Sequence, residues 1–266
     1  MADPRIAFIG GSGLYEMDGL SDVRHVEVDT PFGPPSDSIT IGSLDGVTVA
    51  FLPRHSRGHR LSPTEIPATA NIYALKTLGV ERIVSVSAVG SLRDHIRPLD
   101  MLIPDQIIDR TRNRTSTFFE NGIIAHIAFS DPFCPEISSV LAGAARKQAT
   151  THVGGTCVVI EGPQFSTRAE SELYRSFGAD IIGMTALPEA KLAREAEMCY
   201  ATLALVTDFD TWHQTEDDVS VDLVIANLRR NVASSRLVMR EVASRLPTER
   251  SCTCGHALES AIITDP

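Results

Sequence analysis

Short, continuously apolar runs alternate along this chain with longer segments of helical spacing. The runs have the length of strands and are apolar at most positions, as buried strands are: Ile6–Ile9, Val47–Leu52, Ile83–Val86, Met101–Ile103, Cys157–Ile160, Ile181–Met184 and Thr202–Val206. Between them, the sequence predicts helices over Pro63–Leu75, Pro135–Lys147, Thr167–Phe177, Pro188–Met198 and from Val219 to about Leu246. Strands that alternate with helices indicate an α/β fold, with helices on both faces of a largely parallel sheet.

Length and charge limit the classes of function. With 266 residues and a hydrophobic fraction of 43%, the chain can bury a large core. It contains no repeat, low-complexity tract or flexible linker, so we expect one domain over residues 1–266, with the tail after about residue 247 as a surface appendage. The net charge of −10 includes no Lys/Arg-rich run, and we therefore expect no nucleic acid as a partner.

Membrane and secretion signals are also missing from the sequence pattern. No stretch approaches the roughly 18 consecutive apolar residues of a spanning helix, and the segment Met1–Arg5 lacks the layout of a secretion signal. Cys134, Cys157 and Cys199 stand apart from one another in apolar or aromatic surroundings, which is typical of reduced core residues. We therefore expect a cytoplasmic protein with no membrane partner.

Three predicted strands are followed by residues that suit an anion. The first leads into Gly10–Gly13, where glycines bring backbone N–H groups close to a ligand and Ser12 adds a hydroxyl. The second precedes Arg54 and His55, which offer charged and neutral donors. The third ends near Ser87. Each segment also fits an ordinary turn, but ligands of α/β proteins bind at strand ends, so together they predict an anion site.

Two further segments suit a flat organic ligand. Phe165 offers a ring for stacking, whereas Thr167 is better explained as the N-cap of the next helix, with Glu170 completing a capping box. Strand alternation points Asp208 and Asp210 the same way. Two convergent carboxylates need a cation or hydrogen-bond donors between them. A metal site has only His213 as a further ligand nearby, and the alternative is an amino-substituted heterocycle.

The order of these segments resembles the 5′-methylthioadenosine phosphorylases, a branch of the trimeric purine nucleoside phosphorylases. The likeness runs from about Arg5 to the last predicted helix and rests on ordered motifs: Gly10–Leu14, Asp29–Ser36, Arg54–His55, Ala88–Leu92, Glu161–Pro163, Gly183–Thr185 with Pro188–Glu189, and Asp208–Asp210. The resemblance implies a single α/β domain with a central mixed, partly barrel-like sheet flanked by helices. It also implies reversible phosphorolysis of 5′-methylthioadenosine to adenine and 5-methylthioribose 1-phosphate, in methionine and purine salvage.

The resemblance further implies site residues, a homotrimer or hexamer, and inorganic phosphate as a co-substrate with no cofactor and no metal. It implies a phosphate site of Ser12, Arg54, His55, Ser87, Ala88 and Thr185. It implies a nucleoside site of Phe165, Met184, Asp208, Phe209, Asp210, Val221, Val224, Ile225 and His59, with His126 from a neighbouring subunit. Its catalytic positions hold Asp208, Ser166 and Val221.

Cleavage of the glycosidic bond builds positive charge on the sugar, which a phosphate beneath C1′ stabilises before it attacks. The departing adenine needs a proton at N7. We hypothesise that Asp208 supplies it, with a pKa raised by burial and by Asp210. A carboxylate also accepts from the amino group of adenine and repels a 6-oxo base, and Val221 offers nothing to a 5′-hydroxyl. Adenine nucleosides with an apolar 5′ group are therefore the expected substrates.

The chain departs from the family pattern at a few positions. Ser56 stands where the family usually has Gly, and Ala68-Thr69 where it has an aromatic-then-polar pair. Cys252 and Cys254 resemble a C-terminal Cys-X-Cys feature of some members; a local disulfide or redox role is one interpretation, and free thiols in a reducing cytosol are the expectation.

Alternatives to this function stay open. A related phosphorylase acts on 5′-deoxyadenosine, adenosine or methylthioinosine. A hydrolytic nucleosidase dispenses with phosphate, and a non-catalytic nucleoside-binding module releases no base.

Overall fold

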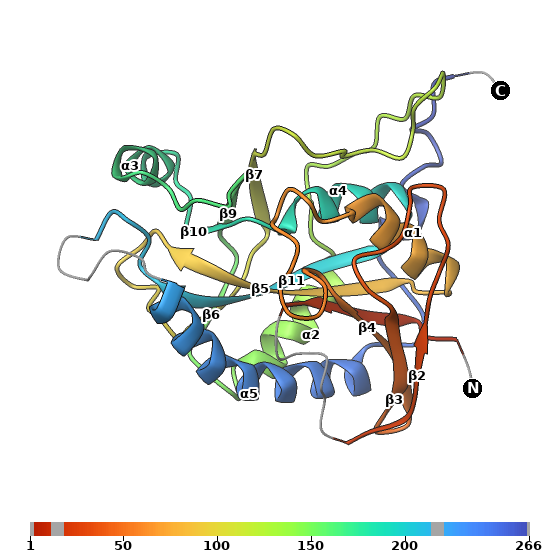
Figure 1. The fold of residues 1–266 in the computed structure, drawn as a ribbon, viewed down its shortest axis with the longest axis horizontal. Coiled ribbons are helices and arrows are strands. Elements are labelled where there is room, and N and C mark those ends of the chain that lie inside the picture. Colours follow the sequence, from red (N-terminus) through yellow and green to blue (C-terminus); the bar gives the residue numbers. More distant parts are fainter. Residues whose placement is uncertain (1–2, 12–18, 214–220, 265–266) are drawn as a thin grey trace.

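The computed structural model describes residues 3–11, 19–213 and 221–264, without the side chains of Val221 and Leu223. Its centre is a mixed sheet, shown edge-on in Figure 1. The strands of the described residues are β1 (Ile6–Gly10), β2 (Leu20–Val26), β3 (Ile39–Leu44), β4 (Val47–Pro53), β5 (Arg82–Ser91), β6 (Met101–Ile103), β7 (Gln106–Arg110), β8 (Thr151–Val153), β9 (Thr156–Ile160), β10 (Ile181–Gly183) and β11 (Cys199–Asp208).

Helices cover both faces of this sheet. Helices α1 (Ala68–Thr77) and α4 (Ala186–Glu195) pack on one face, and α2 (Pro135–Ala145) and α5 (Val221–Arg245) pack on the other, as Figure 1 shows. Helix α3 (Arg168–Ser176) lies beyond β9 and β10, and a short 3₁₀ helix, η1 (Thr253–His256), follows α5. Strand alternation divides the core: in β1, Ala7 and Ile9 join one apolar cluster, and Ile6 and Phe8 join the other.

The edge of strand β5 creates the space for a ligand. Strand β11 pairs in parallel with β5 along one edge, from Arg82 to Gly90. On the opposite edge, β1 pairs with β5 only as far as Ser85, and β10 begins to pair with it at Gly90. Among the described residues, the stretch 86–89 therefore has no strand partner on this edge. The sheet splits there, and the backbone and side chains of β5 become accessible.

Most of the predicted elements are present, with shifted ends. Helix α1 begins at Ala68 and not at Pro63, because prolines at 63 and 67 disfavour helical geometry in the residues before them. The mixed sheet that the family resemblance implies is confirmed, with antiparallel pairs of β2 with β3, β3 with β4, β5 with β10 and β6 with β11 beside the parallel ones. None of the described helices combines the length and apolar character of a membrane span.

Candidate active site

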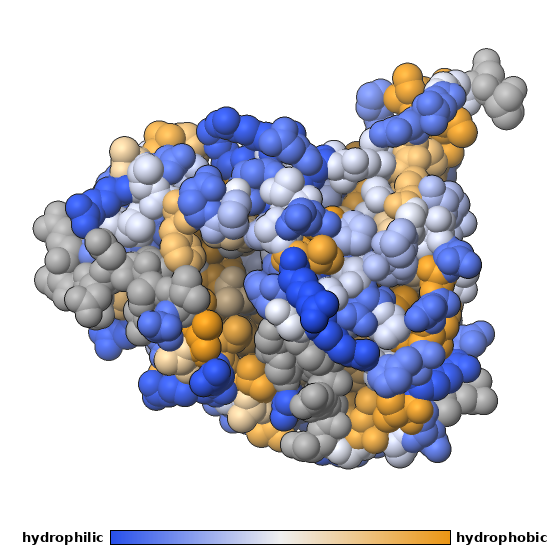
Figure 2. All heavy atoms as spheres, in the orientation of Figure 1, coloured by the Kyte–Doolittle hydropathy of each residue, from blue (hydrophilic) through white to orange (hydrophobic). Residues whose placement is uncertain are grey.

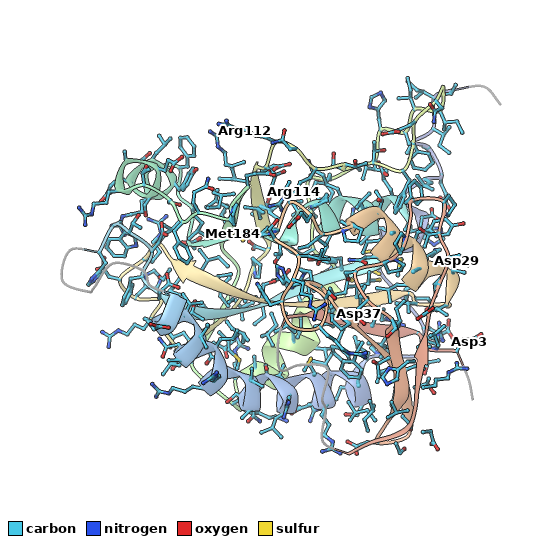
Figure 3. The ribbon with its side chains drawn as sticks, in the orientation of Figure 1. Asp3, Asp29, Asp37, Arg112, Arg114 and Met184 are labelled. Carbon is cyan, nitrogen blue, oxygen red and sulfur yellow. The ribbon has the colours of Figure 1, made fainter. Side chains whose placement is uncertain are left out.

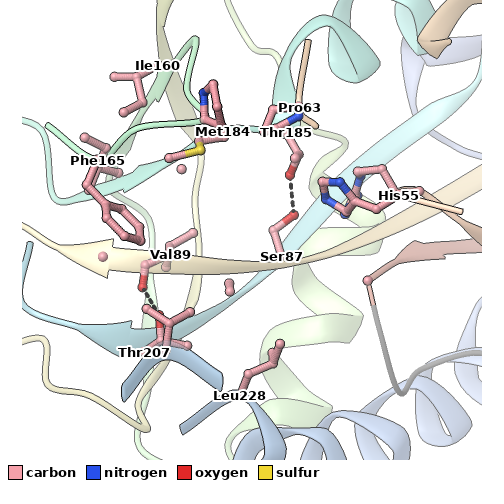
Figure 4. Close-up of a pocket in the computed structure, with 18 of the residues that line it drawn as sticks. His55, Pro63, Ser87, Val89, Ile160, Phe165, Met184, Thr185, Thr207 and Leu228 are labelled. Carbon is pink, nitrogen blue, oxygen red and sulfur yellow. Dashed lines mark hydrogen bonds between the residues drawn. The ribbon is translucent and has the colours of Figure 1, made fainter. Parts of the chain in front are cut away.

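A cavity of about 560 Å³ opens where the sheet splits. This volume is in the range of sites that hold a small organic ligand. Five segments form most of its wall: the turn after β4, the gap in β5, the loop after β9, the start of α4 and the end of β11. Helix α5 closes one side with Val224 and Leu228, and Figure 4 shows Leu228 facing the other labelled lining residues.

One end of the cavity carries hydroxyl groups and a histidine. The Ser87 and Thr185 hydroxyl oxygens lie 3.1 Å apart, and His55 stands on the same side of the cavity (Figure 4). Thr185 precedes α4, and its hydroxyl makes no capping bond to that helix. One of the two hydroxyls donates to the other, so one O–H is left to donate to a ligand. Hydroxyl groups suit an oxyanion, because they donate without adding charge and can rotate toward it.

Arg54 lies behind this end, in a buried ion pair with Glu189. Its Nε donates to Glu189 Oε1 at 2.5 Å, and its Nη2 donates to Ser85 Oγ at 2.7 Å. The guanidinium is about 1% exposed, and Tyr200 Oη also donates to Glu189, at 2.9 Å. Burial would lower the pKa of Arg54, but the carboxylate of Glu189 raises it, so the cation is retained. The fold thus fixes a positive charge in the wall of the cavity.

His55 is held as a neutral imidazole. Burial and the charge of Arg54 lower its pKa to about 4. Its Nδ1 lies 2.8 Å from the carbonyl oxygen of Leu61, which only accepts, so Nδ1 carries the proton. Nε2 is then an acceptor, suited to a protonated oxygen of a ligand. The ring of His59 stacks on that of His55, with centroids 4.2 Å apart.

The opposite end of the cavity carries two buried carboxylates. Asp208 and Asp210 are each about 5% exposed. Burial, with a contribution from Asp210, raises the pKa of Asp208 to about 6, although the Thr207 hydroxyl donates to it at 2.7 Å. Burial also raises the pKa of Asp210. Asp210 Oδ2 and Ser166 Oγ are buried without a hydrogen-bond partner among the described residues. A ligand with N–H donors and an acceptor would satisfy them.

Gly90 lets the Asp208 carboxylate approach strand β5. A Cβ atom on residue 90 would lie 2.9 Å from Asp208 Oδ1 and 3.0 Å from Ile182 Cγ2. No side chain fits there without displacing a neighbour. Phe165, on the same side of the cavity, presents its ring inward in Figure 4.

Arg114 fixes two of the loops that form the wall. Its Nη1 donates to the carbonyl oxygens of Met184 and Leu187, at 2.5 and 2.7 Å, and its Nη2 donates to that of Glu161 at 2.5 Å. Figure 3 shows Arg114 close to Met184. The side chain of Met184 in turn fills the space beside Gly162, where a Cβ would lie 2.6 Å from its sulfur. One guanidinium therefore holds the loop after β9 against the start of α4.

The cavity brings together most of the residues that the sequence singles out: Arg54, His55, His59, Ser87, Ala88, Phe165, Ser166, Met184, Thr185, Asp208, Asp210 and Val224. Phe209, Ile225 and His126 do not line it. Phe209 stacks on His213, and Ile225 and His126 are exposed. Ser12 lies outside the described residues. Val221 begins α5, but its side chain is not among those described.

Sequence reasoning missed one residue of the cavity wall, Leu228, and two residues that support the wall from behind, Glu189 and Arg114. Glu189 was part of a motif, but nothing in its spacing connects it with Arg54, 135 positions away. Arg114 belongs to no motif, and Leu228 was read only as part of a helix face. Ser56, by contrast, now has an explanation: its φ of 61° is a backbone conformation that favours glycine. Its hydroxyl donates to Asp37 Oδ2 at 3.1 Å, which is a bond that glycine could not make.

Comparisons with known proteins agree with one another over nearly the whole chain. Residues 5–244 match the model of the phosphorylase superfamily, and this range includes the entire cavity wall. The chain is 59% identical over 262 residues to S-methyl-5′-thioadenosine phosphorylase of Geobacter sulfurreducens, which covers 98% of this chain and 92% of the relative. A solved methylthioadenosine phosphorylase from an Antarctic soil metagenomic library has a TM-score of 0.93 at 54% identity, covering 100% of this chain and 94% of that one.

A more distant structure carries a ligand. Methylthioadenosine phosphorylase from Schistosoma mansoni, solved in complex with adenine, has a TM-score of 0.87 at 34% identity, covering 97% of this chain and 96% of that chain.

Proposed function

The chain belongs to the phosphorylase superfamily, among the S-methyl-5′-thioadenosine phosphorylases, and we propose that its cavity carries out the reversible phosphorolysis of 5′-methylthioadenosine. The products are adenine and 5-methylthioribose 1-phosphate. One observation carries the proposal: the hydroxyls of Ser87 and Thr185 and the buried carboxylates of Asp208 and Asp210 line the same cavity. An oxyanion and an aminated base can therefore be held on two sides of one ribose.

The phosphate end supplies donors and one fixed charge. We assign Ser87, Ala88, Thr185 and His55 to direct phosphate binding, with Ser12 added from the family resemblance. Arg54 keeps its contact with Glu189 and stabilises the dianion through its charge. This assignment differs from direct binding of phosphate by Arg54, and it is supported by the protein acceptor that each of the three guanidinium nitrogens already has. Neutral His55 accepts a hydrogen bond from a protonated phosphate oxygen through Nε2.

The reaction proceeds by displacement at C1′. A phosphate oxygen forms a bond to C1′ as the bond from C1′ to N9 breaks, and the electron pair of that bond moves into the purine. Met184 lies beneath the ribose, and Phe165 stacks on the base. Protonated Asp208 donates to N7 and so accommodates the charge on the leaving adenine; a pKa of about 6 keeps part of the population protonated near neutral pH. Turnover requires no further group.

The residues that line the cavity also explain its selectivity for the base and for the 5′ group of the nucleoside. The oxygens of Asp208 and Asp210 accept from the amino group of adenine, and Ser166 Oγ provides a second polar contact. At the other side of the ribose, Val224 and Leu228 present apolar surface to the methylthio group. The family resemblance adds Val221 and Ile225 to this region, although Ile225 is exposed and does not line the cavity of the single chain, and it puts His59 at the edge. An apolar wall disfavours a 5′-hydroxyl, which it cannot satisfy.

The proposal also covers the location of the enzyme, its assembly and its co-substrate. We infer a cytoplasmic enzyme of one domain, which acts as a homotrimer or hexamer, uses inorganic phosphate as a co-substrate and needs no cofactor in the reaction. The segments 123–126 and 261–264 pair with each other and carry the exposed residues Ile123, Ile124, Ile262 and Ile263. Apolar side chains gather at this corner in Figure 2. It supports an interface through which His126 reaches a neighbouring cavity.

The direct test is adenine release from 5′-methylthioadenosine with and without phosphate. We expect release to depend on phosphate and to yield 5-methylthioribose 1-phosphate. Release that is equal without phosphate would instead identify a hydrolytic nucleosidase, and binding without release would identify a non-catalytic module. Parallel assays with adenosine, 5′-deoxyadenosine and methylthioinosine measure the selectivity. Asp208→Ala should lower kcat by about 100-fold or more, because it removes a general acid; near-normal turnover would refute the role of Asp208.

A further inference from the structure

Four of the five cysteines meet at one point beside the start of strand β11, whereas Asp208 of the phosphorolysis cavity stands at the other end of that strand. Cys134, Cys199 and the pair Cys252 and Cys254 come from three separate parts of the sequence, yet all four sulfur atoms lie within 4.8 Å of one another. Three of the side chains are buried, and Cys252 is partly exposed. None of these residues lines the cavity. The proposed reaction makes no use of them.

Each sulfur is positioned by regular structure. Cys134 is the residue before helix α2, and its N–H donates to the carbonyl of Tyr200 at 2.8 Å. Cys199 is the first residue of β11. Cys252 and Cys254 flank the start of η1. The cluster thus connects helix α2, the sheet and the C-terminal segment, and all four cysteines lie in or directly before an element of secondary structure.

Hydrogen bonds outside the cluster hold the C-terminal segment in place. Glu136, in the first turn of α2, accepts from the Ser251 N–H at 2.6 Å and also from the Ser251 hydroxyl. Arg250 Nη1 donates to the carbonyl of Glu197 at 2.9 Å, and the Leu258 N–H donates to Glu197 Oε1 at 3.1 Å. These contacts place residues 252 and 254 beside Cys134 and Cys199 without any covalent bond. The four cysteine side chains are therefore held together by the fold itself.

The sulfur separations suit a metal ion better than disulfides. The Cys199 and Cys252 sulfurs are 3.3 Å apart, well beyond the S–S bond length of about 2.0 Å. With Zn–S bonds of about 2.3 Å, a tetrahedral site separates its sulfurs by about 3.8 Å. The Cys199–Cys252 separation of 3.3 Å and the upper limit of 4.8 Å for all sulfur pairs lie on either side of that value. Small movements of the side chains would give four equal bonds.

Two arginines supply the positive charge that such a site needs. Four thiolates on Zn²⁺ carry a net charge of −2. Arg82 is the strand partner of Cys199 in the parallel pair of β5 and β11, so both side chains project from the same face of the sheet. The Arg82 side chain is about 2% exposed, and its Nε and Nη2 have no hydrogen-bond partner in the part of the chain that the structure describes. Arg250 lies beside the same cysteines, since a Cβ atom on Gly255, the residue after Cys254, would lie 2.7 Å from Arg250 Nη2.

One carboxylate beside the cluster, that of Glu81, is shared among three arginines and cannot balance the charge of all of them. Its Oε2 accepts from Arg5 Nη2 at 2.6 Å and lies 3.6 Å from Arg82 Nη1 and 3.9 Å from Arg250 Nε. Glu136 is engaged by Ser251. A buried guanidinium with two unpartnered donors is unfavourable unless an anion lies nearby. Thiolates on a metal provide that anion, whereas neutral thiols do not.

We propose that Cys134, Cys199, Cys252 and Cys254 bind one structural zinc ion, with Arg82 and Arg250 balancing the charge of the thiolate shell. Binding releases the thiol protons as four Zn–S bonds form, and no oxidant or reductant takes part. All four positions of a tetrahedral ion are occupied by protein, so the site is closed and has no catalytic position. Its role is to fasten the C-terminal segment to the core.

The C-terminal segment in turn supports a second loop. Two residues that follow η1 contact this loop. The carbonyl of Ala261 accepts from the His126 N–H at 2.8 Å, and Ile262 forms a β-bridge with Ala125. Figure 1 shows the two segments running together to the corner that carries the C-terminus. Zinc therefore stabilises the loop around His126 as well as the tail.

The test is the metal content of the reduced protein, measured by elemental analysis after exchange into buffer without zinc. We expect about one zinc per chain, or uptake of the same amount from added Zn²⁺, and tetrahedral thiolate absorption bands when Co²⁺ is used instead. The Cys252→Ser/Cys254→Ser variant should lose more than about nine-tenths of the zinc and should unfold at a lower temperature.

Controls separate zinc loss from general damage. Cys157→Ala removes the one buried cysteine outside the cluster and should keep its zinc. Cys252→Ser, at the partly exposed position, leaves three ligands and should release zinc to a chelator faster. Three results would each overturn the proposal: no stoichiometric uptake by the reduced protein, iron in place of zinc, or a disulfide between cluster cysteines in protein purified with a reductant. Retention of zinc by the double variant would also do so.

Discussion

Replacement of Asp208 by Asn should stabilise the ligand-free protein, and by more at higher pH. The carboxyl group of Asp208 is about 5% exposed, and burial raises its pKa from an ordinary value of 3.8 to about 6. Between these two pH values, the folded state therefore holds a proton that the unfolded chain has already lost. Ionisation of this group opposes folding as pH rises between these two values.

The magnitude follows from the shift in pKa. A difference of about 2 units, at 1.36 kcal/mol per unit, costs the folded state about 3 kcal/mol at pH 8. At pH 5 the folded state is mostly protonated, and the cost falls to about 1.5 kcal/mol. Asn has no charge at either pH and still accepts from the Thr207 hydroxyl. The advantage of Asp208→Asn should therefore grow by about 1.5 kcal/mol from pH 5 to pH 8.

Urea unfolding at pH 5 and pH 8, without phosphate and at one protein concentration, measures this difference. Asp37→Asn is the matched control. Although burial opposes it, hydrogen bonds from Arg57 and Ser56 hold the pKa of Asp37 below its ordinary value. Asp37 is therefore ionised at both pH values, and its replacement should change the stability equally at each. An Asp208→Asn effect that is constant with pH, or destabilising at pH 8, would refute the argument.

Three further substitutions test the cavity. Gly90→Ala should raise KM for the nucleoside and cost about 1–3 kcal/mol of stability, since its Cβ would lie 2.9 Å from an Asp208 oxygen; unchanged kinetics would contradict this packing. Glu189→Gln should destabilise the chain by about 3 kcal/mol in urea unfolding, because it leaves the Arg54 charge buried without a counter-ion; a neutral effect would show that the pair is dispensable. The unchanged chain should lose stability below pH 6.5, because the pKa of His55 is lowered to about 4 in the folded state. The free energy of unfolding of His55→Asn should therefore rise by about 2 kcal/mol relative to that of the unchanged chain as pH falls from 7 to 5. The same pH dependence of stability in both proteins would exclude that shift.

Local sequence determined much of the fold and of the site. Strands β1, β4, β6 and β9 could be located because continuous apolar runs mark strands buried on both faces, and α2, α3 and α5 because helical spacing and caps are local signals. The capping box of α3 was predicted from Thr167 and Glu170 and is present. Strands β2, β3, β7 and β8 were missed, because polar, glycine-containing or very short strands lack that pattern.

Tertiary structure alone decided how the chemical groups are used. The sequence presents Arg54 as a free cation, but the fold pairs it with Glu189, 135 residues away. The sequence presents Cys134 and Cys199 as isolated core residues, but the fold gathers them with Cys252 and Cys254. The pKa of Asp208 likewise depends on burial beneath segments distant in the chain. Spacing along a chain reveals which residues share an element, whereas charge, protonation and ligand sets depend on which elements meet.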